Sequence, residues 1–117
     1  MKYVLLLVFL IFASSGSIES GTISWPVDSA NLNARGAAEL YSKHCASCHG
    51  KDGRAKTFKG KLKRARDLSE PEWQGRVGDE RIFNSIMNGK GNMPAYKKKL
   101  SDQEIDSLVP YVRGLRK

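Results

Sequence analysis

Apolar residues recur at helical spacing in two stretches of the C-terminal half, and each stretch carries its own start or stop signals. The first has an apolar stripe of Ile82, Phe83, Ile86 and Met87. Asp79 is its candidate N-cap, and Gly89 is a typical C-terminal stop. The second has an apolar face of Ile105, Leu108, Val109 and Val112. Ser101 and Glu104 have capping-box spacing before it, and Pro110 is expected to bend it by removing one hydrogen bond.

Two further helices are predicted from capping residues and helix formers. Asn31 or Asn33 can cap a helix whose residues, mostly good helix formers, lead directly into a pair of cysteines. Ser69 and Glu72 have capping-box spacing around Pro71, a residue that the first turn of a helix tolerates. Together the four stretches predict an all-α fold of about four helices.

The N-terminal residues differ from the rest of the chain. Residues 1–20 have the form of a secretory signal peptide, with a lysine, an apolar run over residues 4–13 and then small and polar residues. The run is shorter than the ~20 residues of a transmembrane helix. We expect cleavage after Ser15, Ser17 or Ser20, with an uncleaved anchor as the alternative. Residues 21–32 are predicted to be an extended lead-in, and residues 33–117 one small domain.

The chain is strongly basic, with a formal net charge of +8 at pH 7. Residues 51–66 hold eight lysines and arginines against the single acid Asp52, and residues 97–99 are three more lysines. Because residues 51–66 show no sustained periodicity, we predict a loop. Its charge fits either a solvated surface or a docking surface. A nucleic acid partner is not expected, because the signal peptide pattern predicts an exported protein.

The candidate chemistry lies in the sequence Cys-Ala-Ser-Cys-His at residues 45–49. On one helical turn, Cys45 and Cys48 share a face, where both sulfurs can reach the two vinyl groups of one haem. His49 follows at once and is then placed as the proximal iron ligand. This spacing is the sequence signal for covalent attachment of a c-type haem.

Two other interpretations of the cysteine pair are possible, and the rest of the sequence fits neither well. A thioredoxin-like dithiol is expected within a βαβ unit, whereas the neighbouring residues are predicted to be helical. A zinc site needs four ligands, and beyond the motif only His44 is at hand, too close in sequence to complete a tetrahedron easily. We interpret His44 as a residue of the surface or next to the site rather than an iron ligand.

Met93 lies in a glycine-flanked loop that ends at Pro94, where no helical stripe accounts for an apolar side chain. A thioether that completes the second axial position of the iron accounts for it, and enough chain separates Met93 from His49 to pass around the haem. Met87 belongs to an apolar stripe and is interpreted as a packing residue. Trp73 is assigned to the core, with a hydrogen bond to a haem propionate as the alternative.

Taken together, residues 33–115 resemble a class I monohaem cytochrome c of the small bacterial exported type. The resemblance implies a small cytochrome c fold wrapped around one covalently attached haem c, with Cys45 and Cys48 as attachment residues and His49 and Met93 as iron ligands. It also implies that the first and last helices cross. The family usually has a glycine eight residues before the first cysteine, where this chain has Ala37.

The function expected from this resemblance is one-electron transfer by a soluble, monomeric periplasmic carrier. Expected partners are redox proteins with an acidic docking surface, or an anionic membrane surface. No set of catalytic acid, base and nucleophile is visible, so no enzymatic activity is expected. The alternatives are a haem enzyme or gas sensor with a labile distal site, and a dedicated electron-transfer subunit of a dehydrogenase or oxidase complex.

Overall fold

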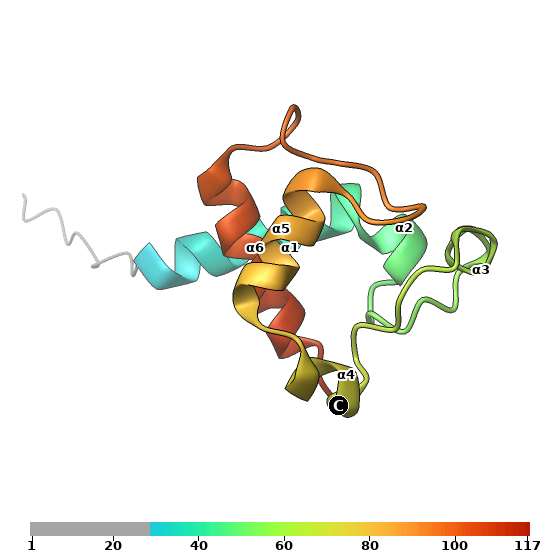
Figure 1. The fold of residues 1–117 in the computed structure, drawn as a ribbon. Helices are drawn as coiled ribbons and strands as arrows, with labels where there is room; N and C mark the ends of the chain where they lie inside the picture. The colour runs from blue at the N-terminus through green and yellow to red at the C-terminus, as the bar shows by residue number, and fades with distance from the viewer. Residues whose placement is uncertain (1–28) are drawn as a thin grey trace, which may run out of the picture.

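The first and last helices of the domain cross near its centre, and the other elements are arranged around this crossing (Figure 1). The computed structural model describes residues 29–117. Its elements in chain order are α1 (Ser29–His44), α2 (Ala46–His49), α3 (Phe58–Lys63), α4 (Pro71–Arg76), α5 (Asp79–Asn88) and α6 (Asp102–Gly114). Within these residues there is no β-strand, only an isolated bridge between Lys90 and Met93. The predicted all-α fold is confirmed.

Ala37 and Tyr41 bury the face of α1 that packs on α6, with 2% and 1% of their surface exposed. The Tyr41 ring lies 4.8 Å from that of Tyr111, between ring centroids. Ala37 therefore takes the buried place where the family usually has glycine. A Cβ atom added to Gly36, one residue earlier, would meet nothing within 4 Å. The predicted crossing thus forms with an alanine at the close approach, and Gly36 has no part in it.

One apolar cluster joins α1, α5 and α6. Its buried members are Tyr41, Leu68, Ile82, Ile86, Leu100, Ile105, Leu108, Val109 and Val112. Both predicted apolar stripes contribute to it, and Phe83 and Met87 pack against it partly buried. Burial of these side chains supplies the main favourable term for folding.

Several helix boundaries differ from the predicted ones. α1 begins at Ser29, so residues 29–32 are helical, and the prediction of an extended lead-in is wrong for them. The signal peptide prediction and residues 21–28 lie outside the described residues. The capping box of Ser101 and Glu104 is confirmed. α6 continues through Pro110, whose side of the helix is exposed to solvent.

Two predicted caps are wrong because the side chains bind elsewhere. Ser69 donates its hydroxyl to Asp67 at 2.6 Å, and Glu70 is the N-cap of α4. Asp79 is the first residue of α5 and accepts a hydrogen bond from Arg113 at 2.7 Å. In each case a neighbouring polar group competes successfully for the side chain.

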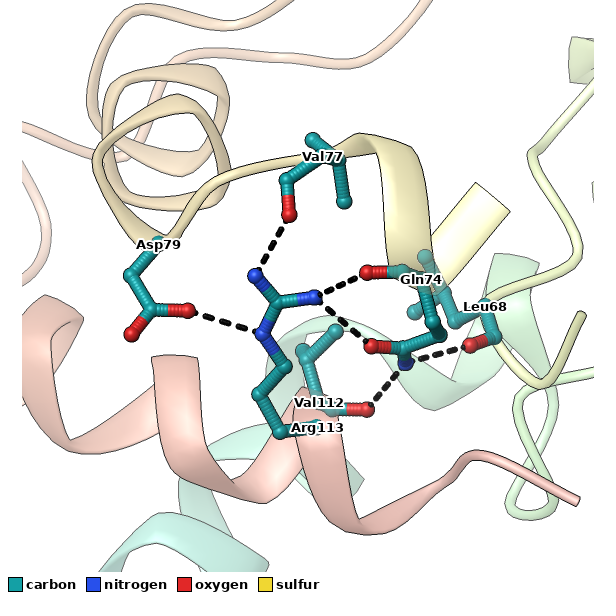
Figure 2. A network of polar contacts seen from close by, with 6 residues as sticks. All are labelled: Leu68, Gln74, Val77, Asp79, Val112 and Arg113. Carbon is teal, nitrogen blue, oxygen red and sulfur yellow. Dashed lines mark hydrogen bonds and ion pairs between the residues drawn. The ribbon is translucent and has the colours of Figure 1, made fainter. Parts of the chain in front are cut away.

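A polar network fastens α4 and the start of α5 to α6 (Figure 2). The Arg113 guanidinium donates to Asp79, to the side-chain and main-chain oxygens of Gln74, and to the Val77 carbonyl. The buried Gln74 amide donates in turn to the carbonyls of Leu68 and Val112, both at 2.8 Å. Because every donor finds an oxygen, the network holds α4 in place without leaving buried polar atoms unpaired.

Residues 51–66 are not entirely loop, because they contain the short helix α3. The Thr57 side chain caps it by accepting a hydrogen bond from the Gly60 N–H at 2.9 Å. Arg64 ends it in the left-handed conformation, with φ of 55°. No helix within residues 29–117 is long and apolar enough to cross a membrane.

Candidate haem site

A cavity of about 450 Å³ opens between the cysteine motif, α4, α5 and the loop that follows α5. It brings together Cys45, Cys48, His49 and Met93, the four residues singled out from the sequence. Its apolar lining includes Leu68, Trp73, Val77, Ile82, Ile86, Leu108 and Val112. This volume lies within the range of roughly 300–1,000 Å³ usual for cofactor and ligand sites. We call this space the central cavity.

The two cysteines are placed by the junction of α1 and α2. Helical hydrogen bonding continues across it, since the Cys45 N–H donates to Tyr41 O at 2.8 Å and the His49 N–H to Cys45 O at 2.9 Å. Both cysteines are half-buried, free and in contact with the central cavity. Burial, together with the nearby Cys48 thiol, raises the pKa of Cys45 to about 11. Cys45 is thus a protonated thiol at neutral pH, unlike the low-pKa thiolate of a dithiol oxidoreductase.

His49 is buried, and its orientation follows from one hydrogen bond. Its Nδ1 lies 2.9 Å from the carbonyl oxygen of Arg66. Because a carbonyl oxygen only accepts, Nδ1 carries the proton, and Nε2 keeps the lone pair that binds a metal. Burial lowers the pKa of His49, outweighing the opposite effect of the Arg66 carbonyl. His49 therefore remains in the neutral form needed for ligation.

Met93 lies in a loop that is tightly fastened to the end of α5. The Met93 N–H donates to Lys90 O at 3.0 Å, and the Lys90 N–H donates to Met93 O at 3.2 Å. Gly89 stops α5 with φ of 75°, and a Cβ atom there would lie 2.6 Å from Met93 O. Only glycine fits this position. Met87, by contrast, packs on the core cluster and does not line the central cavity.

Two residues that the sequence analysis did not assign connect the Met93 loop to distant parts of the site. The Tyr96 hydroxyl donates to His44 O at 2.8 Å, which joins the loop to the end of α1. The Asn92 amide donates to Lys63 O at 3.2 Å, which joins it to the end of α3. The phenol of Tyr96 could have been expected to need a hydrogen-bond partner, but no sequence signal points to a carbonyl acceptor such as His44 O or Lys63 O.

His44 and Trp73 both contact the central cavity. His44 is half-buried, and its ring lies edge-on to Tyr96, with 5.8 Å between centroids. It therefore lies next to the site, as predicted. Trp73 packs on the core cluster and also lines the central cavity, which agrees with the core assignment.

α3 packs directly against the cysteine motif. The Thr57 hydroxyl lies 2.9 Å from Ser47 O and 3.0 Å from Cys48 O, to which it can donate. Gly60 is buried, and a Cβ atom there would lie 2.1 Å from Cys48 O. The haem motif is thus held between α1 on one side and α3 on the other. Within residues 29–117 no group of three or more His, Cys, Asp or Glu side chains is placed to hold a metal ion, as the zinc interpretation would need.

Comparison with known proteins agrees with this geometry. The family model described as cytochrome c oxidase, cbb3-type, subunit III matches residues 32–112. Cytochrome c6 of Leptolyngbya boryana is 33% identical over 82 residues, which are 68% of this chain and 89% of that protein. The cbb3-type cytochrome c oxidase subunit FixP of Azorhizobium caulinodans is 32% identical over 83 residues, 70% of this chain but only 27% of that subunit.

A solved structure described as "KustC0563 c-type cytochrome" is 41% identical to this chain. It superposes with a TM-score of 0.66 over 69% of this chain and 98% of that one. The likeness therefore extends over nearly the whole of that protein.

The contact between α3 and the cysteine motif yields a matched pair of variants. Gly60→Ala should destabilise the holoprotein by at least the ~1–3 kcal/mol typical of overpacking, because the added methyl group overlaps Cys48 O. Gly36→Ala should leave stability unchanged or raise it by up to ~1 kcal/mol, because the position is helical and has free space. Denaturant unfolding followed by circular dichroism measures both. Equal stability of the two variants would contradict the close packing of α3 against the cysteine motif.

Proposed function

The chain belongs to the class I c-type cytochromes, with a covalently bound haem c and a role in electron transfer, and we propose that it is a periplasmic one-electron carrier whose iron is held by His49 and Met93. The observation that carries this proposal is the convergence of both thiols, the imidazole and the thioether on one central cavity. When bound, the haem supplies the Fe(II)/Fe(III) couple.

The donor set and the lining of the central cavity fit this cofactor. Cys45 and Cys48 supply the two sulfurs for thioether bonds, and His49 and Met93 supply the nitrogen and the soft sulfur of a cytochrome c iron site. The charged side chains in the lining are all cationic: Lys63, Arg64, Arg66, Arg81 and Lys90. They match the negative charge of the haem propionates.

A carrier role is favoured over catalysis by the same lining. No Asp or Glu side chain lines the central cavity, so the described residues offer no carboxylate as a general base there. Met93 is held by backbone hydrogen bonds and can keep the sixth position filled. A filled position excludes peroxide and small gases, as a carrier requires and an enzyme or sensor does not.

Location and assembly are part of the proposal. The signal peptide pattern of residues 1–20 supports export to the periplasm, and we propose a monomer. A second candidate is an electron-entry subunit of an oxidase complex, which the match to the cbb3-type subunit III family model favours. The two candidates share the same iron site and differ in their partner.

The proposed partner is a redox protein with an acidic docking surface. The lysines and arginines of residues 51–66 are all exposed, as are the lysines of residues 97–99. Such a surface attracts an acidic partner over a distance set by the salt concentration. An anionic membrane surface is the alternative partner.

Replacement of either attachment cysteine tests the cofactor assignment. Cys45→Ala or Cys48→Ala should give little mature holoprotein, because one thioether bond to the haem is lost. Intact mass and acid-acetone extraction measure the attachment. The same extraction should leave the haem on the wild-type chain, and its removal there would contradict covalent attachment through both thiols.

Replacement of Met93 tests the carrier role. Wild type should show a six-coordinate low-spin spectrum with a sulfur-to-iron charge-transfer band in the ferric state. Met93→Ala should lose this band, lower the reduction potential and bind carbon monoxide readily, because the thioether favours ferrous iron and blocks the sixth position.

Met87→Ala is the matched control for the iron ligand. Met87 is half-buried, so the Met87→Ala variant should lose free energy of unfolding at the low end of the ~2–5 kcal/mol found for buried side chains, or less. Its visible spectrum should not change. The ligand assignment is wrong if the band disappears in Met87→Ala and persists in Met93→Ala. Rapid binding of carbon monoxide by wild type, with peroxide turnover, would favour the enzyme or sensor alternative.

Charge reversal tests the steering of the partner. Lys61→Glu with Lys63→Glu should slow electron transfer to an acidic blue-copper protein at 0.1 M salt, where the Debye length is ~10 Å, and have little effect at 1 M, where it is ~3 Å. Arg35→Glu on the exposed part of α1 is the control. Stopped-flow rates measure the effect, and a rate independent of salt would mean that these charges are only solvated.

A further inference from the structure

α3 exposes two large apolar side chains on one face. Phe58 is 85% exposed and Leu62 is 69% exposed, and they are four residues apart, so they are neighbours on the helix surface. Gly60, on the opposite face, is buried against Cys48 O. The buried face therefore fixes the direction of the exposed one. We call Phe58 and Leu62 the α3 apolar pair.

The α3 apolar pair is surrounded by cations. Exposed basic residues flank it on both sides: Lys56, Lys59, Lys61, Lys63 and Arg64. None of these five takes part in an ion pair among the described residues. The nearest acids along the chain, Asp52 and Asp67, accept hydrogen bonds within their own turns. An apolar centre within a charged rim is the usual anatomy of a protein interface.

α3 is held firmly beside the haem motif. Thr57 contacts the carbonyls of Ser47 and Cys48, and Lys63 O accepts from Asn92 in the Met93 loop. Figure 1 shows α3 at one side of the molecule, next to α2 and away from α6. A molecule docked on the exposed face of α3 would therefore be separated from Cys48, one of the two proposed haem attachment residues, by the width of this one helix, ~10 Å.

We propose that the α3 apolar pair anchors a redox protein whose surface presents an apolar patch within an acidic rim. This inference rests on the proposed electron-carrier function. A protein fits better than a membrane, because two side chains on a six-residue helix offer far less apolar area than an amphipathic membrane helix. Transient electron-transfer complexes, by contrast, use interfaces below ~1,200 Å².

The experiment measures the second-order rate of electron transfer from the reduced holoprotein to an acidic blue-copper protein. Phe58→Ser should lower this rate about tenfold at both 0.1 M and 1 M salt, because an apolar contact is not screened. Leu62→Ser should act in the same direction, and Phe58→Leu should restore most of the rate. Leu32→Ser, at the 55%-exposed Leu32 of α1, is the matched control and should stay within twofold of wild type.

Reduction by ascorbate and oxidation by ferricyanide separate this inference from the proposed function. If wild type does not cycle with these small reagents, the carrier function itself is wrong. If it cycles, but Phe58→Ser reacts with the copper protein as fast as wild type, the docking inference is overturned. Vesicles of phosphatidylserine and phosphatidylcholine test the membrane alternative. If Phe58→Ser keeps the wild-type rate with the copper protein but no longer binds these vesicles as wild type does, the α3 apolar pair binds a membrane, and the inference is overturned.

Discussion

The packing of α1 against α6 determines where the haem motif lies. Ala37 and Tyr41 are almost fully buried at this contact, and α1 continues within one residue into α2. The Tyr41 hydroxyl donates to Gly50 O at 2.8 Å, directly after His49. Any movement of α1 relative to α6 would therefore move both cysteines and the histidine together. The helix crossing supports the core and positions the site at once.

Main-chain carbonyls supply much of the support around the two proposed iron ligands. His49 is oriented by Arg66 O, and the Met93 loop is fastened to Lys63 O through Asn92. These two carbonyls belong to one short segment, residues 63–66, which also lines the central cavity. Because the backbone makes these contacts, the side chains of Lys63, Arg64 and Arg66 stay exposed as cations. One segment can thus combine structural support with an electrostatic surface.

The sequence was sufficient for features that depend on local pattern. The spacing of Cys45, Cys48 and His49, the stripe of α5 and the capping box of α6 each lie within a few neighbouring residues, and the structure has the stripe and the capping box as predicted. The convergence of Met93 on the cysteine motif also agrees with the proposed ligation. Helix starts were less predictable.

Ser69 and Asp79 show why those starts were missed. Each has a side chain suited to capping. Each side chain instead binds another polar side chain, and the local sequence pattern does not predict that this partner is preferred over the backbone N–H groups of the helix. For Asp79 this partner is Arg113, far away in sequence. The support of His49 by Arg66 O could not be predicted either, because any residue supplies a carbonyl and only the fold brings this one within hydrogen-bond distance.

The central cavity also depends on the whole fold. Six core residues also line it: Tyr41, Leu68, Ile82, Ile86, Leu108 and Val112. A haem held in the central cavity would therefore pack against the core itself, and in so small a domain binding of the cofactor would stabilise the fold.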